Sequence, residues 1–184
     1  LTPMVATARL IKQEHPDASV VFIGPCASKK LEASRRTVRS DVDFVITFEE
    51  LTGMFEAKGI LLDEIKAMDE MKDATAAGRG YGVAGGVANA IKECIEKYYP
   101  GTPVNIQHAE SLAECKKALL LAKAGKMNGC LIEGMACPGG CIAGAGTNIA
   151  IPVAAKAVDK FKNEAEKKVP DESVDQEMVE LEKE

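Results

Sequence analysis

Three features of the chain predict an α/β fold with a mainly parallel four-stranded sheet and helices on both faces. Short apolar runs alternate along the sequence with longer segments of helical periodicity. Each apolar run is continuous, as in strands whose two faces are both covered. Aromatic residues make up only 4% of the chain, and the many small aliphatic residues suit helices packed on a parallel sheet.

Four apolar runs are expected to form the strands. They are Ser19–Ile23, Asp43–Thr47, Val104–His108 and Asn128–Glu133. Helices are expected around and between them, over residues 2–15, 48–57, 86–98, 112–124 and 149–168. Strands separated by helices predict right-handed crossovers and therefore parallel pairing.

Two of these helices have the sequence of a capping box at their start, a Ser or Thr followed three residues later by Glu. Thr47 and Glu50 form one such pair, and Ser111 and Glu114 form the other. In each pair the two side chains are expected to bond each other's main-chain N–H groups, which fixes the first turn of the helix.

The net charge of −5 comes largely from the end of the chain. Residues 170–184 contain seven acidic residues and one basic residue, and the remaining residues contain 22 basic and 21 acidic ones. A body without excess positive charge predicts no binding to nucleic acid. Residues 1–169 are therefore expected to form the folded part, and residues 170–184 a disordered acidic tail.

The chain shows no membrane-spanning run and no signal peptide, because Lys or Pro interrupts each apolar stretch well short of about 20 residues. The six cysteines therefore predict a reducing compartment, the cytoplasm, in which thiols serve more often as ligands or core residues than as disulfides. We expect no membrane partner.

The stretch "IEGMACPGGCIAGAG" (Ile132–Gly146) follows the last predicted strand and contains Cys137 and Cys141. Their three-residue spacing, with two glycines, lets both sulfurs face one centre, with main-chain N–H groups directed at it. A disulfide is the weaker explanation in a reducing compartment. Zinc would favour a second cysteine pair nearby, so the pattern suits an iron–sulfur site better.

Cys26 follows the first predicted strand, and the two lysines after it favour a reactive thiolate. The ends of parallel strands are where ligands gather, so Cys26 is expected near the same edge as Cys137. A loop cysteine without a role is the alternative for Cys26. The other three cysteines lie among apolar residues and are expected to be buried structural thiols. They are Cys94, Cys115 and Cys130.

Two stretches resemble signatures of the iron-iron (FeFe) hydrogenases. "GPCASKKLEA" has a Pro-Cys pair, a Lys three residues after Cys26 and a Glu three residues after Lys29. "EGMACPGGCIAGAG" has Glu, Met135, Cys137, Cys141 and a glycine cluster in the family's order. The resemblance extends over residues 1–146 and implies one lobe of the family's H-cluster domain.

The resemblance implies a 4Fe-4S cluster joined through a cysteine sulfur to a two-iron subcluster that carries CO, cyanide and a bridging dithiolate. By position, Cys26, Cys137 and Cys141 would be the metal ligands, with Cys141 also bridging to the two-iron unit. Lys29 would donate a hydrogen bond to a cyanide, Met135 would pack beside the two-iron unit, and Glu32 would support the lysine. The implied activity is the interconversion of hydrogen with two protons and two electrons, or the sensing of hydrogen.

The family's first signature, with its paired cysteines, has no counterpart in these 184 residues. The fourth cluster ligand and the proton-passing thiol are missing with it. The fragment alone is therefore expected to be inactive and to hold no cluster. An upstream ferredoxin-like domain or a downstream regulatory domain is expected in the full-length protein.

Gly24 stands where known catalytic members have Met, and Ala145 interrupts a run of three glycines. Both departures resemble the sensory branch of the family. The alternative function is a non-catalytic iron–sulfur or signalling module that never receives the two-iron unit.

Overall fold

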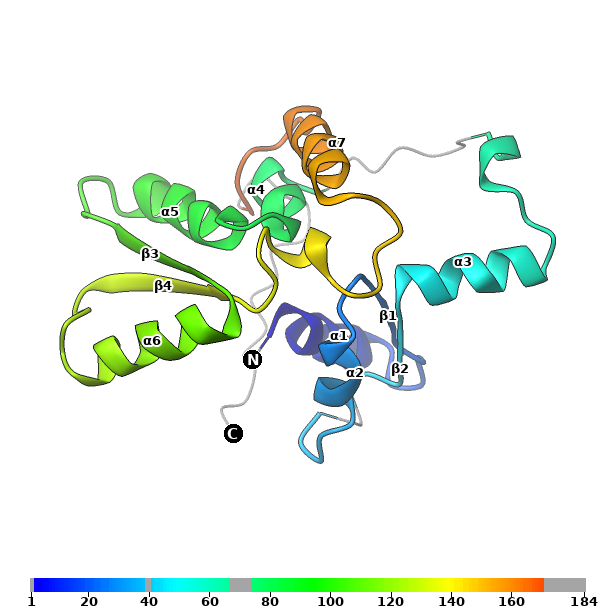
Figure 1. The fold of residues 1–184 in the computed structure, drawn as a ribbon, viewed down its shortest axis with the longest axis horizontal. Coiled ribbons are helices and arrows are strands. Elements are labelled where there is room, and N and C mark those ends of the chain that lie inside the picture. The colour runs from blue at the N-terminus through cyan, green and yellow to red at the C-terminus, as the bar shows by residue number, and fades with distance from the viewer. Residues whose placement is uncertain (1, 39–40, 67–73, 171–184) are drawn as a thin grey trace. The chain divides into compact units, whose positions relative to one another are not determined.

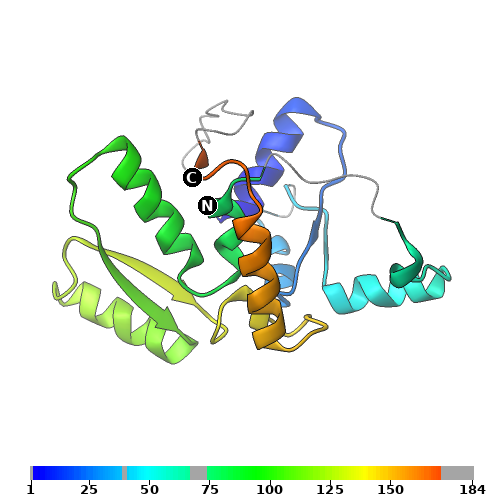
Figure 2. The same ribbon diagram turned by 90° about the horizontal axis from the view of Figure 1, so that it is seen from above.

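The computed structural model describes residues 2–38, 41–66 and 74–170. These residues form two compact units. The first unit contains the described residues up to Lys66 together with Gly144–Asn148. The second unit contains residues 74–143 and 149–170. Figures 1 and 2 show the elements of each unit.

The first unit is built on one parallel strand pair. Its elements are α1 (Pro3–Glu14), β1 (Val21–Ile23), α2 (Ser28–Ala33), β2 (Phe44–Ile46), α3 (Phe48–Ala57) and the 3-10 turn η1 (Leu62–Glu64). β1 pairs with β2 in parallel, with Phe22 opposite Val45. The apolar face of α1 contributes Met4, Val5 and Ala8 to the core, against which Phe22 and Val45 pack.

The capping box predicted at the start of α3 is confirmed. Thr47 Oγ1 accepts the N–H of Glu50 at 3.2 Å, and Glu50 Oε2 accepts the N–H of Thr47 at 2.8 Å. Glu50 also binds Lys30 Nζ at 2.6 Å. The hydrogen bond from Lys30, followed by that from the Thr47 main chain, lowers the pKa of Glu50 to about 2.

The second unit is built on a longer parallel strand pair. Its elements are α4 (Ala76–Arg79), η2 (Gly80–Gly82), α5 (Gly86–Tyr98), β3 (Asn105–Glu110), α6 (Leu112–Lys123), β4 (Cys130–Met135), η3 (Cys141–Ala143) and α7 (Ile151–Asn163). β3 pairs with β4 along its whole length, from Asn105 opposite Cys130 to Glu110 opposite Met135. Figures 1 and 2 show α5 and α6 on opposite faces of this pair.

The capping box predicted at Ser111 is only half correct. Ser111 Oγ accepts the N–H of Glu114 at 3.1 Å, as expected. The Glu114 carboxylate instead accepts the N–H of Glu110 at 2.8 Å, one residue before the expected partner. The carboxylate thus ties the first turn of α6 to the end of β3.

The α/β fold with parallel strands is confirmed, but the single four-stranded sheet is wrong. The four strands among the described residues form two sheets of two strands each. Each pair is joined by one short helix, α2 or α6, and belongs to a different unit. Continuous apolar runs located the strands, but the cover expected on both faces is wrong for the first pair, in which Val21, Ile23 and Phe44 are exposed. The runs also do not specify which strand lies alongside.

The last helix, α7, is shorter than predicted: it ends at Asn163 and does not continue to Lys168. The carbonyls of Lys167 and Lys168 accept the N–H groups of Ala76 and Ala77 at 2.8 and 3.1 Å. This segment therefore satisfies N–H groups at the start of α4 that have no acceptor within that helix.

No helix among the described residues combines the length and the apolar character that crossing a membrane requires. The acidic tail predicted over residues 170–184 lies outside the described residues from 171 onward.

Candidate cysteine site

The predicted site residues are divided between the two units. Cys26, Lys29 and Glu32 lie in the first unit, around the loop that follows β1. The second unit contains the others, at and after the end of β4. They are Met135, Cys137 and Cys141. None of the chain's six cysteines forms a disulfide.

Cys26 is half-buried in a loop that several main-chain contacts fix. Its carbonyl accepts the N–H of Lys29 at 3.2 Å, which begins the turn into α2. The preceding carbonyl, that of Pro25, accepts the N–H of Gly146 at 2.9 Å. Gly146 lies so close to Thr47 that a Cβ added to it would be 2.4 Å from the Thr47 Cβ. The loop therefore requires glycine at position 146.

The Lys29 ammonium is held by Glu32 at 2.6 Å, and both side chains are about one-fifth exposed. Thr2 Oγ1 donates to the other carboxylate oxygen of Glu32. Burial raises the pKa of Glu32, but the hydrogen bonds from Lys29 and Thr2 outweigh it and hold that pKa below its usual value. Glu32 thus remains a carboxylate that orients the Lys29 ammonium one turn from Cys26.

Gly24, where catalytic relatives are expected to have Met, is buried directly beside the ring of Phe22. A Cβ built on Gly24 would be 2.9 Å from Phe22 Cε1. A larger residue at position 24 therefore requires the Phe22 ring to move. Phe22 itself packs against the core of the first unit.

The loop from Cys137 to Cys141 is held by main-chain packing. Gly139 and Gly140 both have φ of +93°, a conformation that side chains rarely adopt. A Cβ on Gly140 would be 2.4 Å from the N of Ala84, so the two main chains touch directly. The carbonyl of Gly139 accepts the Ala84 N–H at 3.1 Å. Both glycines are therefore needed for the turn itself.

Two N–H groups of this loop are already used within the protein, contrary to the prediction that they point at a common centre. The Gly139 N–H donates to Glu110 Oε2 at 2.9 Å. The Gly140 N–H donates to the carbonyl of Cys137 at 3.0 Å. The turn leaves Cys137 half-buried and Cys141 exposed.

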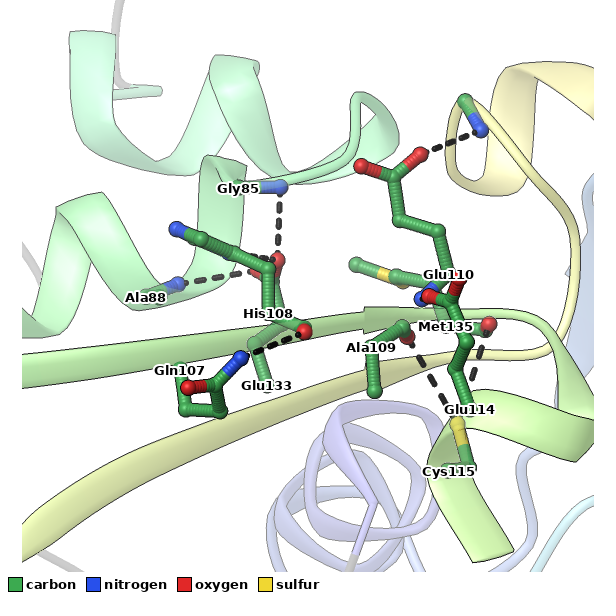
Figure 3. Close-up of polar contacts among 11 residues, drawn as sticks. Gly85, Ala88, Gln107, His108, Ala109, Glu110, Glu114, Cys115, Glu133 and Met135 are labelled. Carbon is green, nitrogen blue, oxygen red and sulfur yellow. Dashed lines mark hydrogen bonds and ion pairs between the residues drawn. The ribbon is translucent and has the colours of Figure 1, made fainter. Parts of the chain in front are cut away.

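A buried carboxylate that the sequence analysis did not single out supports the other side of the loop. Glu133, on β4, is 6% exposed, and its oxygens accept the N–H groups of Gly85 at 2.6 Å and Ala88 at 3.0 Å. His108 Nδ1 lies 3.1 Å from the same carboxylate (Figure 3). Glu133 thus fixes the start of α5, next to Ala84. A charged residue inside the apolar run "CLIEGM" was the available signal.

The remaining cysteines lie away from the loop or are bonded elsewhere. Cys115 Sγ contacts the carbonyls of Ala109 and Met135 at 3.6 and 3.9 Å (Figure 3). Cys130 begins β4, at the opposite end of the strand from Cys137. Cys94, Cys115 and Cys130 are half-buried, so they are less buried than the structural thiols that the sequence predicts.

The donor set can be compared with what an iron–sulfur cluster needs. Thiols at strand ends are the correct ligand type, and Cys26, Cys137 and Cys141 supply three where a 4Fe-4S cluster takes four. Across the described residues, no three His, Cys, Asp or Glu side chains gather closely enough to hold a metal ion. The ligand type therefore fits the cluster, but the described residues do not assemble a set of ligands for it.

The family whose description is "Iron only hydrogenase large subunit, C-terminal domain" matches residues 1–145. Among curated proteins, the chain is 43% identical over 53 residues to the cytosolic Fe-S cluster assembly factor NAR1 of Kluyveromyces lactis. That match covers 29% of this chain and 11% of the relative.

Solved FeFe-hydrogenase structures share the fold. A structure from a study of the oxygen inactivation of FeFe-hydrogenase matches with a TM-score of 0.58 at 20% identity, over 93% of this chain and 61% of that one. A variant of HydA1 from Chlamydomonas reinhardtii matches with a TM-score of 0.57 at 19% identity, again over 93% and 61%.

The chain thus spans less than two thirds of the length of the hydrogenases and of the assembly factor. Identities near 20% support the fold alone, whereas the family match covers most of the chain and includes Cys26, Cys137 and Cys141. The chain therefore belongs to the family of the iron-only hydrogenase large subunit, C-terminal domain.

Proposed function

We propose that this chain is part of a protein that, at full length, binds an H-cluster in the reducing cytoplasm and interconverts or senses molecular hydrogen. The observation that carries the proposal is the fixed turn between Cys137 and Cys141. Two glycines at φ +93° and a main-chain contact with Ala84 hold this turn. A thiol pair held in this way is suited to be a preformed pair of ligands.

Under this proposal, Cys26, Cys137 and Cys141 are the ligands that this chain contributes, and another part of the protein supplies the fourth. When bound, the H-cluster supplies the hydrogen and electron chemistry. Lys29 presents a positive charge to an anionic ligand of the iron, and Glu32 keeps its ammonium in place. Met135 would pack beside the two-iron unit.

Anaerobic reconstitution of the full-length protein with iron and sulfide tests the ligand assignment. We expect Cys137→Ser and Cys141→Ser to lower the iron and sulfide content well below that of the unmodified protein. Cys130→Ser is the matched control, because Cys130 lies on the same strand as Met135 but at its far end. Equal iron loss in the control, or full iron content in Cys137→Ser, would refute the assignment.

From Gly24 and Ala145 we infer that the protein senses hydrogen and does not turn it over rapidly. The Phe22 ring occupies the space that a side chain at position 24 would need, which supports a packing specific to glycine. A sensory protein is expected to change its infrared spectrum under hydrogen while consuming the gas slowly. Turnover at rates usual for catalytic hydrogenases would contradict this role.

The second candidate is an iron–sulfur module without the two-iron unit, and the match to the assembly factor NAR1 favours it. Infrared spectroscopy of the matured full-length protein separates the two candidates, because CO and cyanide stretches require the two-iron unit. A cluster-bearing protein without these bands would support the second candidate over the first.

A further inference from the structure

Glu110 is the last residue of β3, and its carboxylate reaches the loop that carries two of the proposed ligands. Glu110 Oε2 accepts the Gly139 N–H at 2.9 Å in a half-buried position. Gly139 lies in the middle of the turn between Cys137 and Cys141. Figure 3 shows the Glu110 side chain extending away from the side of the strands on which Cys115 lies.

Glu110 is itself held at two points. Strand pairing sets it opposite Met135, two residues before Cys137. The carboxylate of Glu114 accepts its N–H at 2.8 Å, which ties the residue to the first turn of α6. The carboxylate of Glu110 therefore extends from a position that both the sheet and a helix fix.

The two sides of the cysteine turn have different supports. On one side the loop touches the main chain of Ala84, through the carbonyl of Gly139 and the packing of Gly140. On the other side the Glu110 carboxylate takes the Gly139 N–H. The peptide groups of Gly139 are thus bonded on both sides, which fixes the plane of the turn.

We propose that Glu110 is a positioning residue that preforms the Cys137–Cys141 turn before any metal binds. The proposal rests on the proposed function for the identity of the ligand, but the ordering of the turn does not depend on it. A hydrogen bond to a carboxylate stabilises a structure more than one between neutral groups. Loss of the bond between Glu110 and Gly139 should therefore open the turn measurably.

Amide hydrogen exchange of the full chain without iron tests the ordering directly. We expect Glu110→Ala to raise the exchange rate of the Gly139 amide by roughly 10-fold or more. Glu110→Gln retains an acceptor oxygen and should restore most of the protection. The amides of Gly85 and Ala88, which bond to Glu133 in the same unit, should exchange as in the unmodified chain.

Glu96→Ala is the matched control variant, because Glu96 is exposed on α5 and pairs with Lys92 at 3.6 Å. Unchanged Gly139 exchange in Glu110→Ala would overturn the proposal. Equal acceleration at Gly85 and Ala88 would also overturn it, because the effect would then be loss of the whole unit's stability.

The rate of iron and sulfide uptake during reconstitution of the full-length protein is a second measurement, and it separates a positioning role from a general loosening of the packing. We expect Glu110→Ala to take up iron and sulfide more slowly, and Glu110→Gln to take them up at nearly the unmodified rate. If the unmodified protein takes up no iron, the proposed function fails, whereas the exchange result still decides the role of Glu110. Uptake by Glu110→Ala at the unmodified rate would refute preformation of a ligand turn.

Discussion

Replacing Gly140 with Ala should destabilise the second unit more than the same change at its neighbour Gly139. Both residues have φ of +93°, so the backbone strain that alanine introduces is nearly the same, about 1–2 kcal/mol at each position. The surroundings of the new Cβ differ between the two positions. The comparison therefore isolates the close main-chain contact of the cysteine turn.

At position 140 the new Cβ would lie 2.4 Å from the N of Ala84 and 2.7 Å from the carbonyl carbon of Val83. These are main-chain atoms that cannot rotate away, so overpacking adds about 1–3 kcal/mol. At position 139 the nearest atom is the Cγ2 methyl group of Ile151, at 3.3 Å. We therefore expect Gly140→Ala to lose about 1–3 kcal/mol more than Gly139→Ala.

Urea unfolding followed by circular dichroism measures this difference, and the absence of Trp rules out tryptophan fluorescence. With a denaturant slope of about 1–3 kcal/mol per molar, the two midpoints should differ by about 1 M. Gly101→Ala supplies a reference for strain alone, because Gly101 lies in the same unit and has φ of +86° and no neighbour within 4 Å of its Cβ position. Equal midpoints for the variants at positions 139 and 140 would refute the contact.

Two further predictions concern carboxylates. Glu133→Gln should lower the free energy of unfolding by about 1–3 kcal/mol, because the amide has one acceptor oxygen where the carboxylate has two, and the N–H of Gly85 or Ala88 then loses its acceptor. Urea unfolding measures this loss, and unchanged stability would contradict the buried network. Lys30→Gln should raise the pKa of Glu50 from about 2 toward its usual 4.5, measured by NMR titration. Since the lowered pKa stabilises the fold above pH 4.5 and that contribution disappears as pH falls toward 2, the variant should lose stability less steeply over this range. A Glu50 pKa that stays near 2 in the variant would show that Lys30 is not the cause.

Local patterns in the sequence predicted the positions of the strands and of most helix starts. Thr47 and Glu50 are three residues apart, so one short stretch contains all of the information for that capping box. The cysteine turn was located in the same way, from glycines and cysteines that are close in the sequence. Such features depend on residues that are close together in the sequence and need no distant partner.

Features that depend on distant residues could not be predicted. Glu133 was not singled out because its donors, Gly85 and Ala88, precede it by 48 and 45 residues. Glu110 reaches Gly139 across 29 residues. The grouping of the four strands into two pairs was not predicted for the same reason, since a strand's composition does not identify its neighbour.

Gly144–Asn148 belong to the first unit, although most of the second unit precedes them in the sequence. The first unit therefore cannot fold completely until this later segment has been synthesised. The Pro25 carbonyl, next to Cys26, bonds to Gly146, which the ribosome adds 121 residues later. At 5–20 residues per second, this takes about 6 to 24 s. The neighbourhood of Cys26 is therefore among the last parts of the first unit to reach its final structure, and α7 of the second unit follows still later. Under the proposed function, metal delivery to Cys26 is therefore expected after synthesis of the chain.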